Sequence, residues 1–206
     1  MPKYHLPLLT ERSISEAHAN RLASAEAFEA KTLGIGGVSC SAGCSNCCHY
    51  PLSVSILDGI SLYQWLVSHG HWNNKLKARL QEHKDQTWDL APEVWSLAMI
   101  PCPLLSEKGL CSAYEARPFL CRTLFSRGDP HYCHPHRMGA GLAGILHREA
   151  EVDALWKAER QLLKRHQLRQ ILLPLSTALL LGERVAKGDL EIEETHTILL
   201  EEHTQR

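Results

Sequence analysis

Cys40-Ser-Ala-Gly-Cys44-Ser-Asn-Cys47-Cys48 is the stretch around which this chain is organised. Four cysteines fall within nine residues, a density that neither a helix nor a hydrophobic core requires. Thiolate sulfur is a soft ligand suited to zinc and to iron–sulfur clusters, and small residues between the cysteines allow several sulfurs to face one centre. Because Cys47 and Cys48 are adjacent, their side chains diverge. We expect them to bind different metal atoms, or one of them to lie behind the ligands.

Four further cysteines follow at Cys102, Cys111, Cys121 and Cys133. The first stretch resembles a CxxxCxxCC signature, and residues 102–122 are similar to the C-P-x-L…C-x-x-Y-x-x-R-P-x-x-C-R block of the same family. Over about residues 40–127 the chain thus resembles the YkgJ-like cysteine cluster family, described as a zinc- or iron-chelating domain. Cys133 lies beyond this resemblance and is either a ligand or a free loop thiol. The candidate metal ligands are Cys40, Cys44, Cys47, Cys48, Cys102, Cys111, Cys121 and Cys133.

The spacing of the cysteines bears on which metal they bind. Structural zinc sites often combine two Cys-x2-Cys pairs, and only Cys44 and Cys47 have that spacing here. Cubane clusters are often held by several sulfurs from one loop together with a distant donor. The spacing therefore favours an iron–sulfur cluster over zinc, with a redox role. The alternative is a structural zinc-binding interaction module without catalytic activity.

The resemblance includes the cysteine-cluster portion of flagellin lysine N-methylase, and members of the family are often labelled iron–sulfur oxidoreductases. That label leaves open whether this chain is an enzyme. No serine–histidine–acid order, pair of carboxylates or phosphate-binding loop stands out, so the sequence identifies no catalytic residue. With eight cysteines present, no single one is distinguished as a nucleophile.

Length and composition narrow the remaining classes. A chain of 206 residues predicts one domain, and a net charge of -1 gives no general attraction to nucleic acid or to a membrane surface. The longest apolar run, residues 171–181, is too short to cross a bilayer, and the first residues do not form a secretory signal. We expect a soluble, cytoplasmic protein whose reduced thiols are ligands rather than disulfides. No protein partner is identified.

The hydrophobic pattern predicts a mainly helical fold, a single domain over 1–206 with a cysteine core at about 40–133 and a helical C-terminal part at about 146–203. Ser55 and Asp58 resemble a capping box before an apolar stripe of Ile56, Ile60, Tyr63 and Val67, which Leu57, Leu62, Trp65 and Leu66 broaden. No set of alternating strands and helices appears. We expect one helical turn at 112–116, a loop at 126–144, an ambiguous stretch at 91–100, and helices at 11–33, 55–69, 73–89, 146–169, 174–187 and 190–203.

Two motifs suggest other cofactors but lack the structural context they need. Cys40-x3-Cys44-x2-Cys47 has the spacing of the radical S-adenosylmethionine cluster loop, yet Asn46 stands where that loop usually has an aromatic residue and no strand–helix repeats follow. Residues 139–144 match G-x-G-x-x-G, but His-Pro-His-Arg-Met precedes them and is not a strand. A flexible lead into the helix at 146 explains these glycines.

Histidines and arginines close to the cysteines are candidates for supporting roles. His49 follows Cys48 directly and is the best placed histidine. His131, His134 and His136 crowd one loop with Cys133, although thirteen histidines are spread along the chain and a solvated polar loop explains this group better. Guanidinium groups would offset the negative charge of a thiolate centre. Of Arg117, Arg122 and Arg127, the first two fall on the family motif.

Overall fold

The computed structural model describes residues 11–34, 36–41, 43–126, 133, 145–146, 149–165, 169–192 and 194–195. Its helices are α1 (Glu11–Gly34), η1 (Asn46–His49, a 3-10 helix), α2 (Ile56–Ser68), α3 (Asn74–Thr87), α4 (Pro92–Ala98), α5 (Phe119–Thr123), α6 (Glu149–Arg165) and α7 (Leu175–Ala186). Short strands are β1 (Ser53–Ser55), β2 (Phe125–Ser126), β3 (Ile145–Leu146) and β4 (Leu172–Pro174). The prediction of a mainly helical fold is confirmed.

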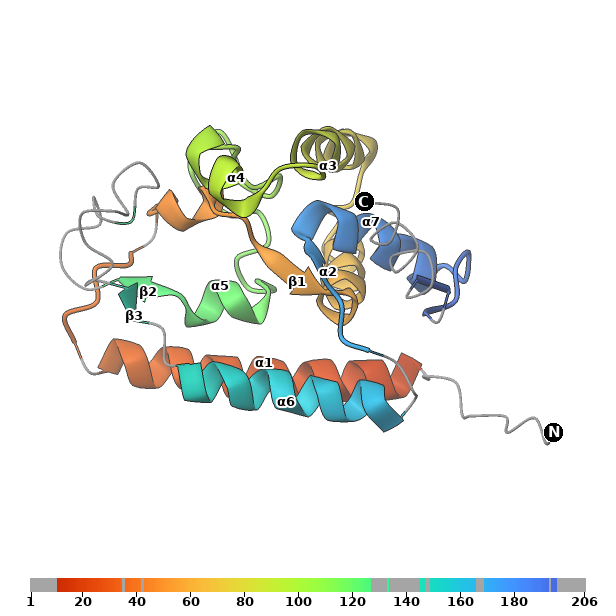
Figure 1. The fold of residues 1–206 in the computed structure, drawn as a ribbon, viewed down its shortest axis with the longest axis horizontal. Helices are drawn as coiled ribbons and strands as arrows, with labels where there is room; N and C mark the ends of the chain where they lie inside the picture. Colours follow the sequence, from red (N-terminus) through yellow and green to blue (C-terminus); the bar gives the residue numbers. More distant parts are fainter. Residues whose placement is uncertain are drawn as a thin grey trace.

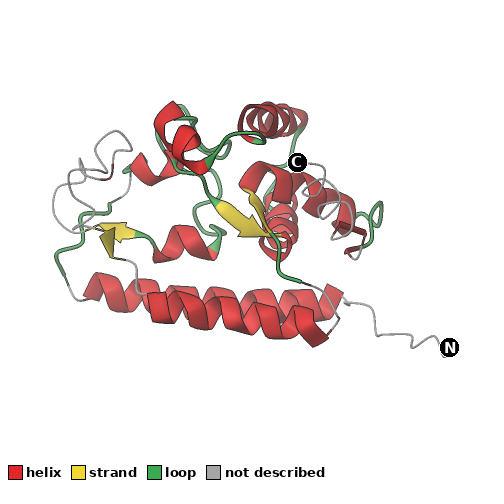
Figure 2. Ribbon diagram, in the orientation of Figure 1, coloured by secondary structure: helices red, strands yellow, loops and turns green. Residues whose placement is uncertain are grey.

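The helices form two groups. In Figure 1 one lies along the bottom of the molecule and the other lies on its right side. The long helices α1 and α6 lie side by side, and α5 packs on α1. The second group consists of α2 and α3, both of which contact α7. Loops and the short helices η1 and α4 occupy the space to the upper left, as the colouring by secondary structure in Figure 2 makes clear. The first cysteine block, Cys102 and Cys111 belong to this loop-rich part, whereas Cys121 lies on α5.

The predicted capping box starts α2. The Asp58 amide donates to Ser55 Oγ at 3.2 Å, and the Ser55 amide donates to Asp58 Oδ2 at 3.3 Å. Ile56, Ile60 and Tyr63 are buried as predicted. Val67, the last member of the predicted stripe, is 48% exposed instead. Val67 lies in the last turn of α2, which ends at Ser68, and there Leu66 is the fully buried residue.

Two glycines allow α2 and α7 to touch through their backbones. A Cβ atom on Gly59 would lie 2.1 Å from the carbonyl oxygen of Ala178. A Cβ atom on Gly182 would lie 2.6 Å from the carbonyl carbon of Gly59. Neither distance is compatible with a side chain, so glycine is required at both positions for this close approach. The sequence analysis did not identify this contact.

The strands β1 and β4 precede α2 and α7 and pair with each other in antiparallel register, Val54 opposite Leu173. Both of these side chains are fully buried. Three-residue strands give too little alternation to be recognised in a sequence, and they were not predicted. The pairing fixes the starts of α2 and α7 next to each other. It also brings Leu52 and Leu175 together, since the Leu175 amide donates to the Leu52 carbonyl oxygen at 3.2 Å.

Several predicted boundaries are confirmed and others shift. Asn73 caps α3, accepting from the Leu76 amide at 3.0 Å, and the ambiguous stretch 91–100 contains α4, with Pro92 at its first turn. The predicted helix at 146–169 begins at Glu149 instead, because residues 145–146 pair with β2. On α6, Trp156 and Leu163 are buried and Leu162 is half-buried, as predicted. The side chains of Val152 and Leu155, also predicted to point inward, lie outside the described part.

The turn predicted at 112–116 is present, but the helix of this segment is α5, which begins after Pro118. Most of the predicted loop at 126–144, including the G-x-G-x-x-G motif, and most of the predicted helix at 190–203 lie outside the described residues. Among the residues that the structure does describe, no helix has the length and apolar character needed to cross a membrane.

Candidate metal centre

Backbone hydrogen bonds join the two cysteine blocks. Cys47 and Cys48 sit on η1, and the amide of Cys102 donates to the carbonyl oxygen of Cys48 at 2.7 Å. A tight turn, closed by the Leu105–Cys111 bridge, brings Cys111 back beside the second block's first cysteine. Gly109, at φ +72°, forms part of this turn, and its position packs against the Gly43 carbonyl oxygen of the first block. Segments distant in sequence therefore form one loop cluster.

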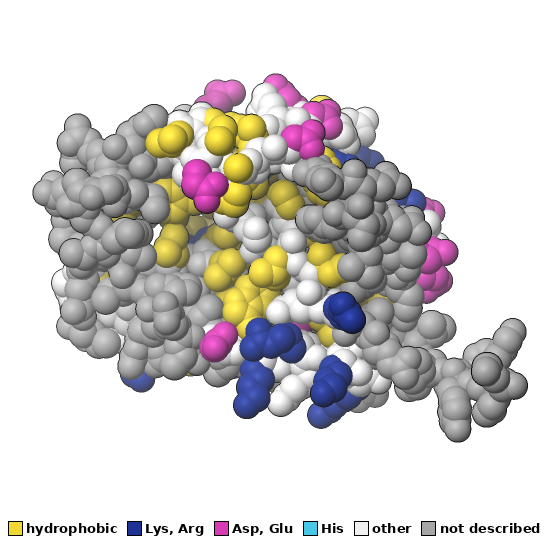
Figure 3. All heavy atoms as spheres, viewed as in Figure 1, with side chains coloured by type: hydrophobic (Ala, Val, Ile, Leu, Met, Phe, Trp, Pro, Cys, Tyr) yellow, Lys and Arg dark blue, Asp and Glu magenta, His cyan; other side chains and the backbone are white. Residues whose placement is uncertain are grey.

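A cavity of about 520 Å³ lies between the two blocks. The apolar part of its wall comes largely from leucines, among them Leu52, Leu104, Leu120 and Leu124. Figure 3 shows hydrophobic side chains gathered in the middle of this face of the molecule, above a row of Lys and Arg. The cysteines that line the cavity are Cys44, Cys47, Cys48, Cys102, Cys111 and Cys121.

A second, small cavity of about 20 Å³ adjoins the first. Tyr50 and Leu124 line both cavities, and Phe125 and Ser126 of β2 contribute to the small one. The cysteines around it are Cys40, Cys44, Cys47 and Cys133. All eight cysteines therefore line one cavity or both, and all eight thiols are free.

The donor chemistry fits zinc or an iron–sulfur cluster, since soft sulfur surrounds both cavities. The sulfurs are not yet arranged as a finished site: within the described ranges, no three Cys, His, Asp or Glu donors converge as ligands of one ion. Metal binding would therefore draw the cysteine loops inward. That the individual cysteines are ligands stays a prediction.

Comparison with known protein families identifies this part of the chain. Residues 39–137, just under half of the 206, match the CxxCxxCC family model, whose description reads "Putative zinc- or iron-chelating domain". We call this matched segment, residues 39–137, the CxxCxxCC domain. The match confirms the family suggested by the sequence and extends far enough to include Cys133. Comparison of the chain with curated proteins and with solved structures gives no match.

Burial makes the thiols of the CxxCxxCC domain reluctant to ionise. It raises the pKa of Cys102 to about 12 and that of Cys121 well above the ordinary value, and it also raises the pKa of Cys111. For Cys47 a hydrogen bond with the Cys48 thiol is the largest cause of a raised pKa, followed by burial. A buried thiolate is costly unless a cation compensates its charge, and a metal ion supplies that compensation.

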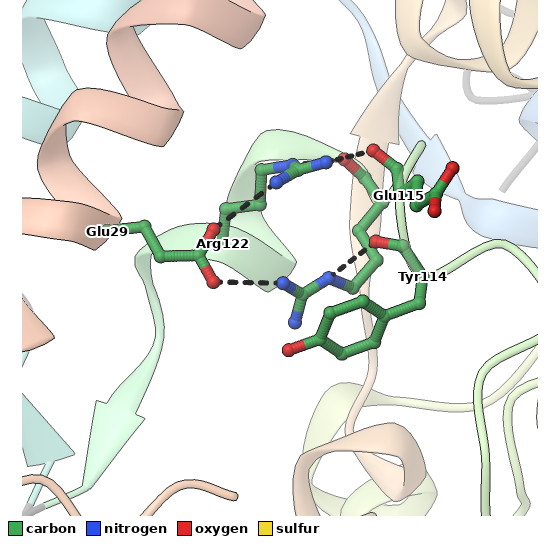
Figure 4. A network of polar contacts seen from close by, with 5 residues as sticks. Glu29, Tyr114, Glu115 and Arg122 are labelled. Atoms are coloured by element: carbon green, nitrogen blue, oxygen red, sulfur yellow. Dashed lines mark hydrogen bonds and ion pairs between the residues drawn. The ribbon is translucent and has the colours of Figure 1, made fainter. Parts of the chain in front are cut away.

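An ion-pair network stands beside the large cavity (Figure 4). The carboxylate of Glu29, on α1, lies between two guanidinium groups, with Arg117 Nη2 at 3.0 Å and Arg122 Nη1 at 3.2 Å. Arg122 Nη2 also donates to the Glu115 carbonyl oxygen. One carboxylate facing two cations leaves a net positive charge next to the thiols.

The two arginines have different places in the CxxCxxCC domain. Arg117 lines the large cavity, and its charge opposes the effect of burial on the pKa of Cys111 and Cys121. Arg122 is only 6% exposed and does not line the cavity; it ties α5 to α1. Of the two arginines that the sequence suggested as neighbours of the metal ligands, only Arg117 therefore lies at the cavity. Arg122 connects α5 to α1. Arg127 lies outside the described residues.

The histidine candidates do not gain support from the described part. His49 lines neither cavity, and its Nδ1 lies 3.1 Å from the Ser45 carbonyl oxygen. His131, His134 and His136 lie outside the described residues.

Two residues that the sequence did not indicate contact cysteines that line the small cavity. The Tyr50 hydroxyl donates to the Cys133 carbonyl oxygen, and burial raises the pKa of Tyr50 to about 12, so this group stays a donor. The Ser126 amide donates to Cys40 Sγ at 3.4 Å. Tyr50 could have been noticed from its place two residues after Cys48, whereas a backbone amide leaves no signal in a sequence.

Proposed function

We propose that the CxxCxxCC domain binds an iron–sulfur cluster through thiolates of both cysteine blocks and that this cluster has a redox role. The observation that carries the proposal is the single cavity of about 520 Å³ lined by six cysteines. A structural zinc ion is held by four ligands, with sulfur at about 2.3 Å. The space exceeds what one such ion uses, and a polynuclear centre accounts for it better.

Two further features support a cluster in this cavity. Cys48, Cys102, Cys111 and Cys121 line this cavity and not the small one, so four thiolates are available to a cluster here. Arg117 places positive charge on the wall, which offsets the negative charge of a centre with four thiolate ligands. Eight free thiols also fit a reducing compartment, and we propose the cytoplasm.

A structural zinc-binding interaction module is the second candidate. The Cys44-x2-Cys47 pair, which has the zinc spacing, favours it. In this case all coordination positions of the zinc ion would be filled by protein ligands, and the centre would be colourless and inert to reductants. The ion would fix the cysteine loops in the conformation that binds a partner.

Anaerobic purification followed by metal and sulfide analysis separates the two candidates. We expect coloured protein that contains iron and acid-labile sulfide and whose visible absorbance decreases when dithionite is added. Colourless protein that holds zinc and no iron would exclude the cluster while leaving metal binding intact. Protein that holds neither metal would overturn both.

Variants test whether both blocks supply ligands. Cys44→Ser and Cys121→Ser should each lower the metal content per chain, because each removes a thiolate that lines the large cavity. His49→Ala is the matched control, since His49 lies between the blocks but lines neither cavity. Full metal occupancy in Cys121→Ser would show that the second block is not a set of ligands.

A further inference from the structure

We propose that the eight cysteines form two separate four-thiolate centres, and that the smaller one holds a single ion of the zinc class. The first centre is the cluster of the large cavity, with Cys48, Cys102, Cys111 and Cys121. The second uses Cys40, Cys44, Cys47 and Cys133 around the small cavity. The inference rests on the proposed function only in taking these cysteines as metal ligands.

The walls of the two cavities divide the cysteines. Cys40 and Cys133 line only the small cavity. Cys48 and the three cysteines of the second block line only the large one, whereas Cys44 and Cys47 line both. The large cavity therefore has four cysteines of its own. The small cavity has two and reaches four, the number that a closed zinc site needs, when it takes both shared residues.

Tyr50 and Leu124 line both cavities and lie, with Cys44 and Cys47, at the boundary between them.

The size of the small cavity selects a mononuclear ion. A space of about 20 Å³ is close to what one water molecule occupies by the same kind of measure. It has no room for a cluster of several metal and sulfide atoms. The Cys44-x2-Cys47 pair adds the ligand spacing of a zinc site. Cys48, the neighbour of this pair, lines only the large cavity, although its thiol lies close to that of Cys47 and not apart from it as predicted. Adjacent cysteines would therefore serve different centres once metal binding replaces the hydrogen bond between their thiols.

Cys40 and Cys133, the first and last cysteines of the small set, are held by hydrogen bonds of the kind that orient metal ligands. The Ser126 amide donates to Cys40 Sγ at 3.4 Å, and the Ser39 amide donates back to the Ser126 carbonyl oxygen at 2.9 Å. The Tyr50 hydroxyl fixes the backbone of Cys133. An amide that donates to sulfur stabilises the thiolate and fixes its direction.

Loading the small centre requires its loop to close, because its four sulfurs do not yet converge on one ion position. Gly36 and Gly37, at φ +77° and +72°, precede Cys40 and give this segment backbone freedom. As a zinc ion binds, each of the four thiols releases its proton to the solvent and becomes a thiolate ligand.

The first test uses the unmodified chain. Protein that carries its cluster is treated with a mild chelator, and one equivalent of Zn²⁺ is added back. The cysteines that react with iodoacetamide are then identified by mass spectrometry. We expect Zn²⁺ to protect Cys40, Cys44, Cys47 and Cys133 and to leave the absorbance of the cluster unchanged. Protection of cysteines from both sets, displacement of the cluster, or no protection at all would overturn the two-centre arrangement.

Reciprocal variants give the second test, each serving as the control for the other. Cys40→Ser and Cys133→Ser should weaken zinc binding at least about tenfold with the cluster spectrum retained, since each removes one of four ligands. Cys111→Ser should remove the cluster and retain one zinc ion per chain. Parallel loss of both metals in all three variants would indicate one shared centre, which overturns the inference but not the proposed function.

The failures of the two proposals are distinguishable. A wild-type chain that holds no cluster, but whose small set is protected by one Zn²⁺, contradicts the proposed function and upholds the second centre. A chain that binds neither metal contradicts both.

Discussion

Two regions of the molecule achieve their order in different ways. In the helix-packed region, formed by α2, α3, α7, β1 and β4, fully buried side chains such as Leu66, Leu80 and Leu179 fill the space between elements. In the cysteine region, residues 36–52 and 101–126, turns and isolated hydrogen bonds surround cavities. Burial of apolar surface is sufficient for the first region. The second leaves open the space in which packing would occur, and it needs another source of stability.

The two regions share a wall. Leu104 belongs to the core cluster of the helix-packed region and also lines the large cavity, as does Leu175 at the start of α7. The helix-packed region therefore provides a rigid side against which the cysteine loops can close. This arrangement predicts that the two regions respond to different perturbations.

The largest expected effect is a loss of stability of the helix-packed region in the variant Gly182→Ala. The added methyl group would lie 2.6 Å from the backbone of Gly59, so α2 and α7 would have to separate. We expect a loss of about 3 kcal/mol or more in the free energy of unfolding, with or without bound metal. Chemical denaturation followed by far-ultraviolet circular dichroism measures it.

Gly34→Ala is the matched control, because a Cβ atom at Gly34 meets nothing within 4 Å. This change should be neutral or slightly stabilising, since alanine favours a helix more than glycine does. Equal stability of Gly182→Ala and wild type would show that the helices do not approach each other as closely as described.

The difference between the two regions also explains what the sequence could predict. The stripe before Val67 and the Ser55–Asp58 capping box predicted α2 well, because periodicity and capping are local signals. The glycine contact between α2 and α7 could not be predicted, since it depends on which helices meet. β1 and β4 were missed for the same reason: a three-residue strand is stabilised by its partner, not by its own pattern.

In the candidate site, the sequence predicted which residues gather but not how they divide. All eight predicted cysteines line the two cavities, a result that follows from the chemistry of clustered thiols. The two cavities meet at Cys44, Cys47, Tyr50 and Leu124, which line both, and this meeting point is set by tertiary structure. Glu29, which holds both arginines, comes from α1 and had no signal near the cysteine motifs.

Removal of the metal should affect the cysteine region selectively. Ligation is expected to supply folding free energy to loops that lack a core, so chelation should lower the melting temperature by at least about 5 °C, which corresponds to roughly 2 kcal/mol for a chain of this size. Hydrogen exchange should increase in residues 43–52 and 101–118, while α2 and α7 remain protected. An unchanged melting temperature after proven loss of metal would refute this dependence.

A smaller effect is expected when the positive charge beside the large cavity is removed. Arg117→Gln should weaken metal binding on the order of tenfold, because the guanidinium group no longer offsets the negative charge of the thiolates. The measurement is competition with a chelator of known affinity. Arg160→Gln is the control, since Arg160 is exposed on α6 and does not line the large cavity. Equal affinities in the two variants would exclude a role for Arg117 at the centre.

The smallest expected effect is a pH dependence that originates in the helix-packed region. His83, on α3, is 6% exposed; its Nδ1 lies 3.1 Å from Ser176 Oγ, and its ring contacts Trp95. Burial lowers the pKa of this imidazole from 6.5 to about 4. The folded protein therefore keeps His83 neutral where the unfolded chain binds a proton. Stability from this group is complete well above pH 6.5 and decreases as the pH falls towards 4.

As the pH falls from 7.5 to 6.0, this difference in protonation should lower the free energy of unfolding by about 0.8 kcal/mol. The loss should reach about 3 kcal/mol near pH 4. The test compares the unfolding free energy of metal-loaded wild type and His83→Gln at both pH values. Any acid sensitivity of the metal centre is common to both proteins and cancels in the comparison. If His83→Gln keeps the wild-type slope, the acid sensitivity of the protein originates in the cysteine region and not in the packed helices.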